Sequence, residues 1–248
     1  MRLGLEGRVA VVTGAGSGIG AGVARALAQE GSLIVAADLR ETGIAPPAEV
    51  GAERWLAVPG DVSTPEGARR PVQAAVEAFG RLDVLVACAG VYETGSLEEV
   101  DEKVWDRVHN VNLRGSYLCA KAAIAEMAGR GFGRVILFSS IAAQTGGGVA
   151  AGPAYVAAKA GIIGLTRSLA QKAGPYGITV NCVAPGVIDT PMTGVMGDDL
   201  KREVARRVPL RRTGSPDDVA FVVAMLAAEG AGYLSGTHVD VNGGLHMA

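Results

Sequence analysis

Residues 8–20 read Arg-Val-Ala-Val-Val-Thr-Gly-Ala-Gly-Ser-Gly-Ile-Gly, a short apolar run that leads directly into alternating glycines. The run predicts a buried strand over 8–13, and the pattern after it predicts a helix over 18–30 that ends at Gly31. Glycines at such a junction let the backbone turn tightly and approach a diphosphate, to which the helix N-terminus offers free N–H groups. An ordinary glycine-rich turn is the alternative, but the position between a first strand and a first helix favours a dinucleotide-binding loop.

The rest of the chain alternates between short apolar runs and longer helical patterns. The runs are rich in Val, Ile and Leu and mostly lack polar alternation, as do parallel strands that are covered on both faces. We expect strands at 8–13, 33–38, 55–59, 82–87, 133–139, 178–183 and 237–241. We expect helices at 18–30, 65–79, 97–109, 112–128, 153–172 and 216–228. This order predicts an α/β fold, a single-domain Rossmann-type doubly wound parallel sheet of about seven strands with helices on both faces.

No linker and no shift in composition divides the chain, so we expect one dinucleotide-binding and catalytic domain over 1–248. Two segments are predicted to be mobile, the glycine-rich loop at 146–148 and the polar, helix-compatible segment 192–209. Three segments are expected to shape the substrate pocket: 144–153, which contains this glycine-rich loop, 91–95 and 192–209.

The composition excludes several classes of protein. The 248 residues carry 23 basic and 25 acidic side chains and a net charge of -2, without a basic block, which argues against nucleic-acid and membrane-surface partners. No apolar run approaches the roughly 18–20 residues of a membrane span. Cys88, Cys119 and Cys182 are odd in number and lack metal-ligand spacing, so we expect reduced thiols, no metal and a cytoplasmic protein.

An acidic residue ends the second predicted strand. Asp38 follows the glycine loop by about twenty residues, where a carboxylate can accept hydrogen bonds from an adenosine ribose and would repel a 2′-phosphate. Leu39 follows it and Ser17 stands in the loop, so neither position supplies a base; Arg40 is near, but its direction is not fixed by the sequence. These residues favour NAD over NADP.

Tyr155 and Lys159 are four residues apart in the predicted helix 153–172 and therefore share one of its faces. A tyrosine of ordinary pKa near 10 is a poor acid or base at neutral pH, but an adjacent ammonium and an oxidised nicotinamide would stabilise its phenolate and lower that pKa. Ser140 follows the strand 133–139, at the strand ends that line the ligand crevice of such sheets, where its hydroxyl could hold a carbonyl or alkoxide oxygen.

At these residues the chain resembles the single-domain branch of the short-chain dehydrogenase/reductase family, over essentially its whole length. The family's TGxxxGxG loop corresponds to 13–20, and its YxxxK motif to Tyr155 and Lys159, with Ser140 as the serine of the triad. The resemblance implies that Tyr155 exchanges the substrate proton and Ser140 positions the substrate oxygen. It implies that Lys159 lowers the pKa of the tyrosine and binds the nicotinamide ribose, and that Asn112 kinks a helix and supports a proton relay.

The same resemblance assigns the pair Asp61-Val62 to the adenine and the segment 185–190 to the nicotinamide, with Ile188 and Thr190 at the carboxamide. The chain departs from the family at Cys88, where the family has an asparagine that ties neighbouring strands together. The catalytic set expected is Asn112, Ser140, Tyr155 and Lys159. The cofactor contacts expected are Gly14, Gly16, Ser17, Gly18, Ile19, Asp38, Leu39, Asp61, Val62, Cys88, Ala89, Gly90, Tyr155, Lys159, Pro185, Gly186, Ile188 and Thr190.

The expected activity is NAD-dependent interconversion of a small secondary alcohol and a ketone. Within the family, the segments 208–210 and 213–218 are most similar to 3-oxoacyl-acyl-carrier-protein reductases and to NAD-dependent secondary alcohol and polyol dehydrogenases. An oxoacyl-thioester reductase is therefore one alternative. A dehydratase or epimerase, which a longer C-terminal substrate domain would favour, is another, and a catalytically silent nucleotide-binding member is a third.

Two further expectations concern partners. Arg206, Arg207, Arg211 and Arg212 form a basic cluster that is either a solvated helix face or a site for an acidic substrate tail such as phosphopantetheine. The predicted helices 112–128 and 153–172 are rich in Ala and Gly, and in the family resemblance they form the dimer face of a tetramer. We therefore expect a homotetramer.

Overall fold

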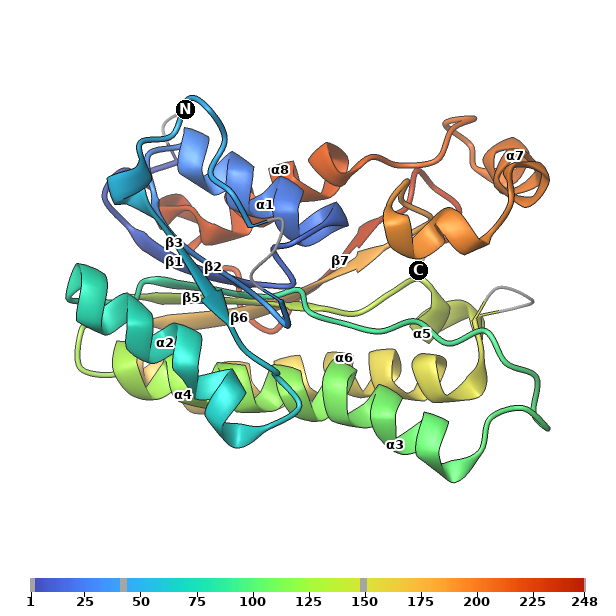
Figure 1. Ribbon diagram of the computed structural model, residues 1–248, viewed down its shortest axis with the longest axis horizontal. Coiled ribbons are helices and arrows are strands. Elements are labelled where there is room, and N and C mark those ends of the chain that lie inside the picture. Colours follow the sequence, from blue (N-terminus) through green and yellow to red (C-terminus); the bar gives the residue numbers. More distant parts are fainter. Residues whose placement is uncertain (1–2, 41–43, 148–150, 248) are drawn as a thin grey trace.

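The computed structural model describes residues 3–40, 44–147 and 151–247, and one parallel sheet forms its centre (Figure 1). Within the described residues, seven strands pair in the order β3-β2-β1-β4-β5-β6-β7, every neighbouring pair parallel, which confirms the predicted fold class. The strands are β1 (Val9–Thr13), β2 (Leu33–Asp38), β3 (Trp55–Pro59), β4 (Val84–Ala87), β5 (Gly133–Phe138), β6 (Ile178–Pro185) and β7 (His238–Val241).

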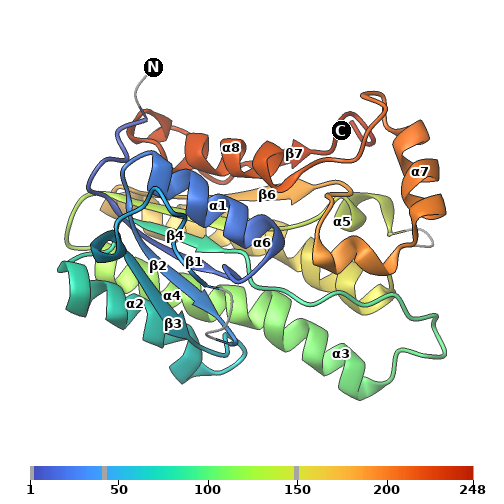
Figure 2. The same ribbon diagram turned by 45° about the horizontal axis from the view of Figure 1, so that its top comes forward.

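Helices cover both faces of the sheet (Figures 1 and 2). On one face, α1 (Gly18–Gln29) packs beside α8 (Pro216–Ala227). On the other face lie α2 (Pro65–Phe79), α4 (Ser116–Met127) and α6 (Pro153–Ala173), with α3 (Glu102–His109) extending beyond them. Two further helices, α5 (Ala142–Thr145) and α7 (Asp198–Arg207), lie at one end of the molecule.

The strands are apolar throughout because each one separates two cores. Along β1, Ala10 and Val12 pack in the layer under α1 and α8, whereas Val9 and Val11 pack in the layer under α2, α4 and α6. Successive side chains of a strand point to opposite faces, so a strand with helices on both sides has no polar face. This explains the unbroken apolar runs of the sequence.

Local capping explains where several helices begin. Thr64 is the N-cap of α2, and its side chain accepts a hydrogen bond from the N–H of Gly67. The helix predicted from residue 97 begins only at Glu102, because the Asp101 side chain caps it by accepting from the N–H of Val104. The helix predicted over 112–128 starts within a π-helical turn, η2 (Asn110–Gly115), and continues as α4.

The segment 192–209, predicted to be a polar insertion compatible with a helix, contains α7. Of the glycine-rich loop at 146–148, Gly148 lies outside the described residues, while Gly146 and Gly147 both have positive φ, 74° and 78°. Such angles suit glycine and follow the end of α5.

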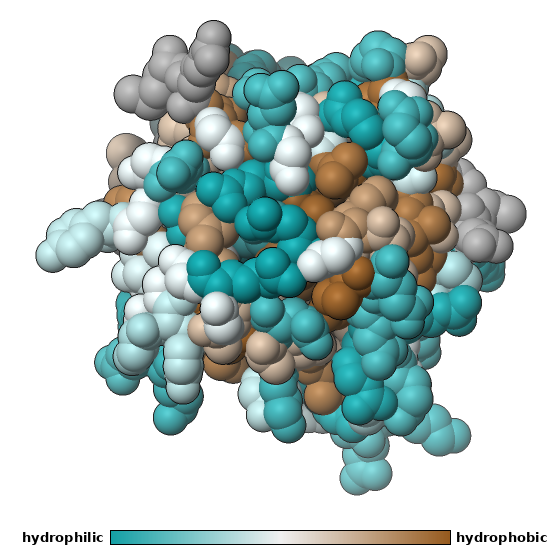
Figure 3. Space-filling view, turned by 90° about the vertical axis from the view of Figure 1, so that its left-hand side faces the viewer, coloured by the Kyte–Doolittle hydropathy of each residue, from teal (hydrophilic) through white to brown (hydrophobic). Residues whose placement is uncertain are grey.

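The described part of the chain contains no helix that is both long and apolar enough to cross a bilayer. Nor do its His, Cys, Asp and Glu side chains gather into a group of three or more that could hold a metal ion. Figure 3 views the end of the molecule opposite α5 and α7, where hydrophilic residues surround smaller apolar patches. A cavity lies at the other end, where α5 and α7 contribute to its lining.

Candidate active site

A cavity of about 700 Å³ opens at the carboxyl ends of the strands. The strand order reverses beside β1, whose neighbours are β2 and β4, and parallel sheets bind their ligands at such a point. All predicted site residues line this cavity except Gly16, whose N–H donates to the lining residue Asp38. The structure therefore brings the glycine loop, Asp38, the segment after β6 and the predicted catalytic side chains to one place.

The glycine loop makes a tight turn between β1 and α1. Gly14 has a φ of 72°, and a Cβ on it would lie 2.8 Å from the backbone of Ala89 in the loop after β4. A Cβ on Gly20 would collide with the carbonyl oxygen of Gly14. The N-cap of α1, Ser17, makes no capping hydrogen bond with its side chain, so the first N–H groups of the helix remain available to an anion. This cradle fits the diphosphate of a dinucleotide.

Asp38 lies at the end of β2, on the wall of the same cavity. Its Oδ2 accepts from the N–H of Gly16 at 3.0 Å and its Oδ1 from the N–H of Leu39 at 2.7 Å, so the carboxylate is fixed against the glycine loop. Each carboxylate oxygen has a further lone pair for a ribose hydroxyl. The neighbouring Arg40 is exposed and does not line the cavity.

Asp61 and Val62 line the cavity beyond the end of β3, the strand next to β2. The Oδ1 of Asp61 accepts from the N–H and the hydroxyl of Ser63, at 2.9 and 2.7 Å. Val62 is buried and contributes an apolar side chain to this part of the cavity wall, whereas Asp38 contributes a charged one. The pair therefore offers a polar and an apolar contact to a flat ring.

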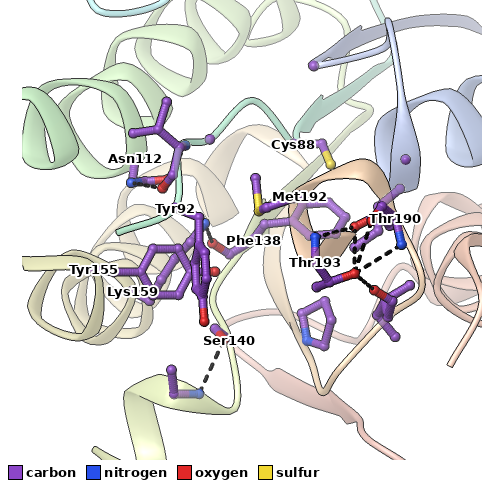
Figure 4. A pocket seen from close by; sticks show the side chains of 18 of the residues that line it. Cys88, Tyr92, Asn112, Phe138, Ser140, Tyr155, Lys159, Thr190, Met192 and Thr193 are labelled. Atoms are coloured by element: carbon purple, nitrogen blue, oxygen red, sulfur yellow. Dashed lines mark hydrogen bonds between the residues drawn. The ribbon is translucent and has the colours of Figure 1, made fainter. Parts of the chain in front are cut away.

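The predicted catalytic side chains are buried and come from different elements. Tyr155 and Lys159 lie one turn apart on α6, Ser140 follows β5, and Asn112 lies in the π-helical turn; their exposed fractions are 9%, 5%, 8% and 0%. Figure 4 shows Tyr155, Lys159 and Ser140 on one side of the pocket and Thr190 and Met192 on the other.

The two adjacent serines after β5 have different tasks. Ser139 donates its hydroxyl to the carbonyl oxygen of Lys159 at 2.9 Å and is thereby committed to α6. Ser140 accepts from the N–H of Ala142 at 3.1 Å, which leaves its hydroxyl proton to serve the phenol of Tyr155 or a substrate oxygen. The geometry therefore favours Ser140 for the positioning role.

Burial governs the protonation of the two groups on α6. It raises the pKa of Tyr155 to about 12, against which the hydrogen bond with Ser140 acts. Burial lowers the pKa of Lys159 to about 8. The Lys159 ammonium donates to the carbonyl oxygen of Phe138 at 2.9 Å and lies 5.6 Å from the centroid of the Tyr155 ring. In the protein alone the pKa of Tyr155 therefore shifts upward, because desolvation outweighs the lowering by the hydrogen bond with Ser140.

Asn112 fastens the loop after β4 to the helix that precedes α4. Its Nδ2 donates to the carbonyl oxygens of Val91 and Val108, at 2.9 and 3.0 Å, and its Oδ1 accepts from the N–H of Val91 at 3.2 Å. The π-helical turn that contains it explains the kink that the resemblance implied. The side chain of Asn112 therefore holds in place the backbone that follows Ala89 and Gly90.

Cys88 stands where the family has an asparagine. Burial raises the pKa of its thiol to about 12, so the group stays protonated and is a poor nucleophile. The connection between β1 and β4 is instead made by Thr13, whose hydroxyl oxygen accepts from the N–H of Ala89 at 3.2 Å. The missing amide is therefore compensated locally.

The end of β6 and the segment after it form the opposite wall, with Pro185, Gly186, Ile188 and Thr190 lining the cavity. Thr190 and Thr193 form a capping box at the start of η4 (Pro191–Val195), which turns the chain back across the cavity.

Other lining residues were not predicted individually. Tyr92 meets the ring of Tyr155 edge-on, and Arg207 lines the cavity from the end of α7. The basic cluster thus divides, because Arg212 pairs with Asp218 at 2.7 Å while Arg207 has no ion pair with any described residue. The sequence had marked Arg207 as part of the basic cluster, for which a site for an acidic substrate tail was one interpretation, and had marked Tyr92 only as part of the segment 91–95. The remaining unpredicted lining includes Phe138, Met192, Met196, Leu200, Glu203, Val204 and Leu245.

Comparisons with known proteins agree with this geometry. A family model described as Enoyl-(Acyl carrier protein) reductase matches residues 14–246. The chain is 41% identical to a mouse (3R)-3-hydroxyacyl-CoA dehydrogenase, with 99% of each chain covered. It is 40% identical to the cis-4-hydroxycyclohexanecarboxylate dehydrogenase of Sinomonas cyclohexanicum, with 96% of each covered.

Among solved structures, a short-chain dehydrogenase/reductase from Brucella melitensis, described as a glucose/ribitol dehydrogenase, is 32% identical with a TM-score of 0.92 over 100% of both chains. Fold, cavity and relatives agree on an oxidoreductase that acts on CH–OH groups with a nicotinamide cofactor. The chain belongs to the short-chain dehydrogenase/reductase family.

Proposed function

We propose that the chain is an NAD-dependent oxidoreductase that interconverts a secondary alcohol and a ketone by hydride transfer, with Tyr155 as general acid and base. The observation that carries this proposal is the burial of Tyr155 beside Ser140 and Lys159 in the cavity that also contains the glycine loop. One domain, 1–248, would supply both the cofactor site and the catalytic groups.

The residues suggest a division of labour. The cofactor, when bound, accepts or supplies the hydride. The substrate oxygen would lie between the hydroxyls of Ser140 and Tyr155, which can both donate to it. In ketone reduction Tyr155 gives its proton to the forming alkoxide, a direction that its raised pKa supports because the phenol is protonated at neutral pH. In alcohol oxidation the same oxygen takes the proton, which requires added positive charge near the ring.

Lys159 is the group that supplies part of this charge. Its Nζ is fixed by the carbonyl oxygen of Phe138, which leaves two ammonium protons for the ribose hydroxyls of a bound nicotinamide nucleotide. Asn112 would act on the reaction through the loop that its side chain holds. Its main-chain carbonyl oxygen accepts a hydrogen bond from the hydroxyl of Ser116 at 2.7 Å.

NAD is the proposed cofactor rather than NADP. The support is the fixed carboxylate of Asp38 at the end of β2, together with the absence of Arg40 from the described cavity wall. A 2′-phosphate beside this carboxylate would bring like charges together without a compensating base.

A 3-hydroxyacyl or 3-oxoacyl thioester is the second candidate substrate. Relatives at 36–41% identity carry names with such substrates, among them the acetoacetyl-CoA reductase of Allochromatium vinosum. The support from this chain is the outer cavity wall, where Met192, Met196 and Leu200 are apolar and Arg207 is cationic. An acyl chain would pack on the first and a phosphorylated carrier would pair with the second.

The experiment that tests the proposed function is steady-state turnover with NAD and with NADP against simple secondary alcohols, polyols, hydroxysteroids and 3-hydroxyacyl-CoA thioesters. Turnover of at least one class with NAD preferred supports the proposal. Turnover with none of them, or with NADP preferred, contradicts it.

We also propose a homotetramer in a reducing, cytoplasmic setting. The three cysteines are free, as the proposal requires. On α6, a Cβ added at Gly164 would meet no described atom within 4 Å, so a neighbouring helix could approach closely at that point. The mass from sedimentation equilibrium decides between a tetramer and a smaller assembly.

A further inference from the structure

The helix that carries Tyr155 and Lys159 has no capping side chain of its own. Its N-cap is Gly152, its first residue is Pro153, and its first turn contains no acidic residue. Pro153 has no N–H, but the N–H groups of Ala154 and Tyr155 lack a partner within the helix. Most helices satisfy such groups with a Ser, Thr, Asp or Asn at the N-cap.

A carboxylate from a distant part of the chain occupies this place instead. Glu93 lies in the loop after β4 and is 7% exposed. Its Oε2 is 3.4 Å from the backbone nitrogen of Tyr155, from which it accepts a hydrogen bond. The backbone oxygen of Glu93 also accepts from the N–H of Gly152 at 2.9 Å. Side chain and main chain of Glu93 thus both hold the start of α6.

Gly152 leaves room for this carboxylate. A Cβ built on Gly152 would collide with the Glu93 carboxylate, although the backbone there is extended, with φ of -83° and ψ of 172°, and could accept any residue. The carboxylate of Glu93 therefore stands in the space that the side chain of an ordinary N-cap residue would fill. The Glu93 carboxylate and a capping side chain at position 152 therefore exclude each other.

The cost of burying Glu93 indicates that its position matters. Its Oε1 is buried and has no hydrogen-bond partner among the described residues. A buried carboxylate with a free oxygen is unfavourable unless local dipoles compensate it, and the N-terminus of a helix does so. If a stable start of α6 were the only requirement, a capping serine at position 152 would provide it more simply. The loop arrangement instead couples α6 to Val91, which Asn112 holds, and to Tyr92, which packs on Tyr155.

We propose that Glu93 is a positioning residue that caps α6 from the loop after β4 and thereby fixes the phenol of Tyr155 relative to Ser140 and the cofactor. Tyr155 is the third residue of α6, so the hydrogen bond from its own N–H sets the place of its ring. This inference rests on the proposed function only for its catalytic consequence; the capping itself does not depend on it.

A four-variant cycle tests the inference: wild type, Glu93→Ala, Gly152→Ser and the double variant. Glu93→Ala is expected to lower kcat by about 10- to 100-fold, since small misplacements of reacting groups have effects of that size. The affinity for NADH should change little. In the double variant the serine hydroxyl reaches the freed N–H of Tyr155 and restores most of kcat, whereas Gly152→Ser alone lowers kcat because its Cβ meets the carboxylate.

The decisive result is that Gly152→Ser lowers kcat when Glu93 is present and raises kcat in the Glu93→Ala background. If Gly152→Ser harms the protein equally with and without Glu93, the inference is overturned. Glu93→Gln, whose amide oxygen can still accept the hydrogen bond, is expected to retain most of kcat, and a loss equal to that of Glu93→Ala would also contradict the proposal. Glu98→Ala, an exposed change in the same loop, is the matched control.

The same cycle is read by thermal unfolding and by amide exchange of the peptide that contains Tyr155. Glu93→Ala should lower Tm by about 2–4 °C and speed that exchange, and Gly152→Ser should reverse both in its background. These measurements need no substrate. A protein without turnover whose cycle still shows the reversal would refute the proposed function alone, whereas an active protein without the reversal would refute the capping alone.

Discussion

The rings of Tyr92 and Tyr155 meet edge-on, with centroids 5.0 Å apart and planes at 83°. Tyr92 comes from the loop after β4, whose backbone Asn112 also holds, and Tyr155 comes from the first turn of α6. The loop after β4 and the first turn of α6 are thus in direct contact through these two rings. Tyr92 shields one side of the phenol from water.

Removing this ring should shift the pH dependence of alcohol oxidation. Burial raises the pKa of Tyr155, and the proximity of Tyr92 raises it further. Tyr92→Ala admits water, so the pKa of Tyr155 should fall and the rising limb of the oxidation rate should move to lower pH. The lost aromatic contact, worth about 0.5–1.5 kcal/mol, should also lower Tm. Tyr92→Phe keeps the ring and is the control; a profile of Tyr92→Ala that matches wild type would contradict the shielding.

The pKa of Lys159 predicts how the affinity for the cofactor changes with pH. Burial lowers its pKa to about 8 in the protein alone, so the side chain is charged below that pH and neutral above it. The affinity for NADH should therefore weaken as the pH rises through about 8, because the ammonium is the form that donates to the ribose and attracts the dinucleotide. Fluorescence titrations from neutral to alkaline pH measure this. Lys159→Met should bind more weakly with a flat profile; an unchanged slope would exclude Lys159 as the titrating group.

Asp38 is expected to select NAD. Asp38→Asn removes the charge and keeps one acceptor oxygen, so only one of the two N–H groups that Asp38 holds, those of Gly16 and Leu39, retains its partner. The ratio of kcat/KM for NAD to that for NADP should fall by about 10- to 100-fold, the effect of relieving one close like-charge contact of roughly 1–3 kcal/mol. Glu98→Gln removes a charge on the exposed loop and should leave the ratio unaltered. An unaltered ratio in Asp38→Asn would show that this carboxylate does not face the ribose.

An alanine variant of Arg207 distinguishes a phosphorylated thioester substrate from an uncharged alcohol. It lines the cavity, whereas its neighbour Arg206 does not. If the substrate is a phosphorylated thioester, Arg207→Ala should raise KM for 3-hydroxyacyl-CoA by about 5- to 20-fold, as expected for a partly exposed ion pair of about 1–2 kcal/mol. Its KM for an uncharged alcohol should not change, and Arg206→Ala should change neither. Equal effects of the two alanine variants would remove the case for a carrier site at Arg207.

The sheet could be predicted because burial on both faces makes each strand an unbroken apolar run. β2 and β3 begin and end at the predicted residues, and β6 continues to Pro185, two residues past its predicted end. The site came together for the same reason, since parallel strands deliver the residues at their carboxyl ends to one edge.

What could not be predicted depends on contacts between distant segments. Glu93 caps α6 and Tyr92 covers Tyr155 only because β4 and α6 are brought together in the fold. Seven of the ten residues of helix α7 are charged and only Leu200, Val204 and Ala205 are apolar, so its helical pattern was ambiguous. The raised pKa of Tyr155 is likewise a property of burial, which the spacing of Tyr155 and Lys159 does not reveal.

The central claim is that Tyr155 exchanges the proton with the substrate oxygen, and Tyr155→Phe tests it most directly. The variant keeps the ring against Tyr92 and removes only the hydroxyl. With the best substrate of the panel, kcat should fall by about 10²- to 10⁴-fold, the usual contribution of a general acid or base. The variant should still bind NADH, because Asp38 and the glycine loop remain. Turnover by Tyr155→Phe at the rate of the wild type would contradict the account.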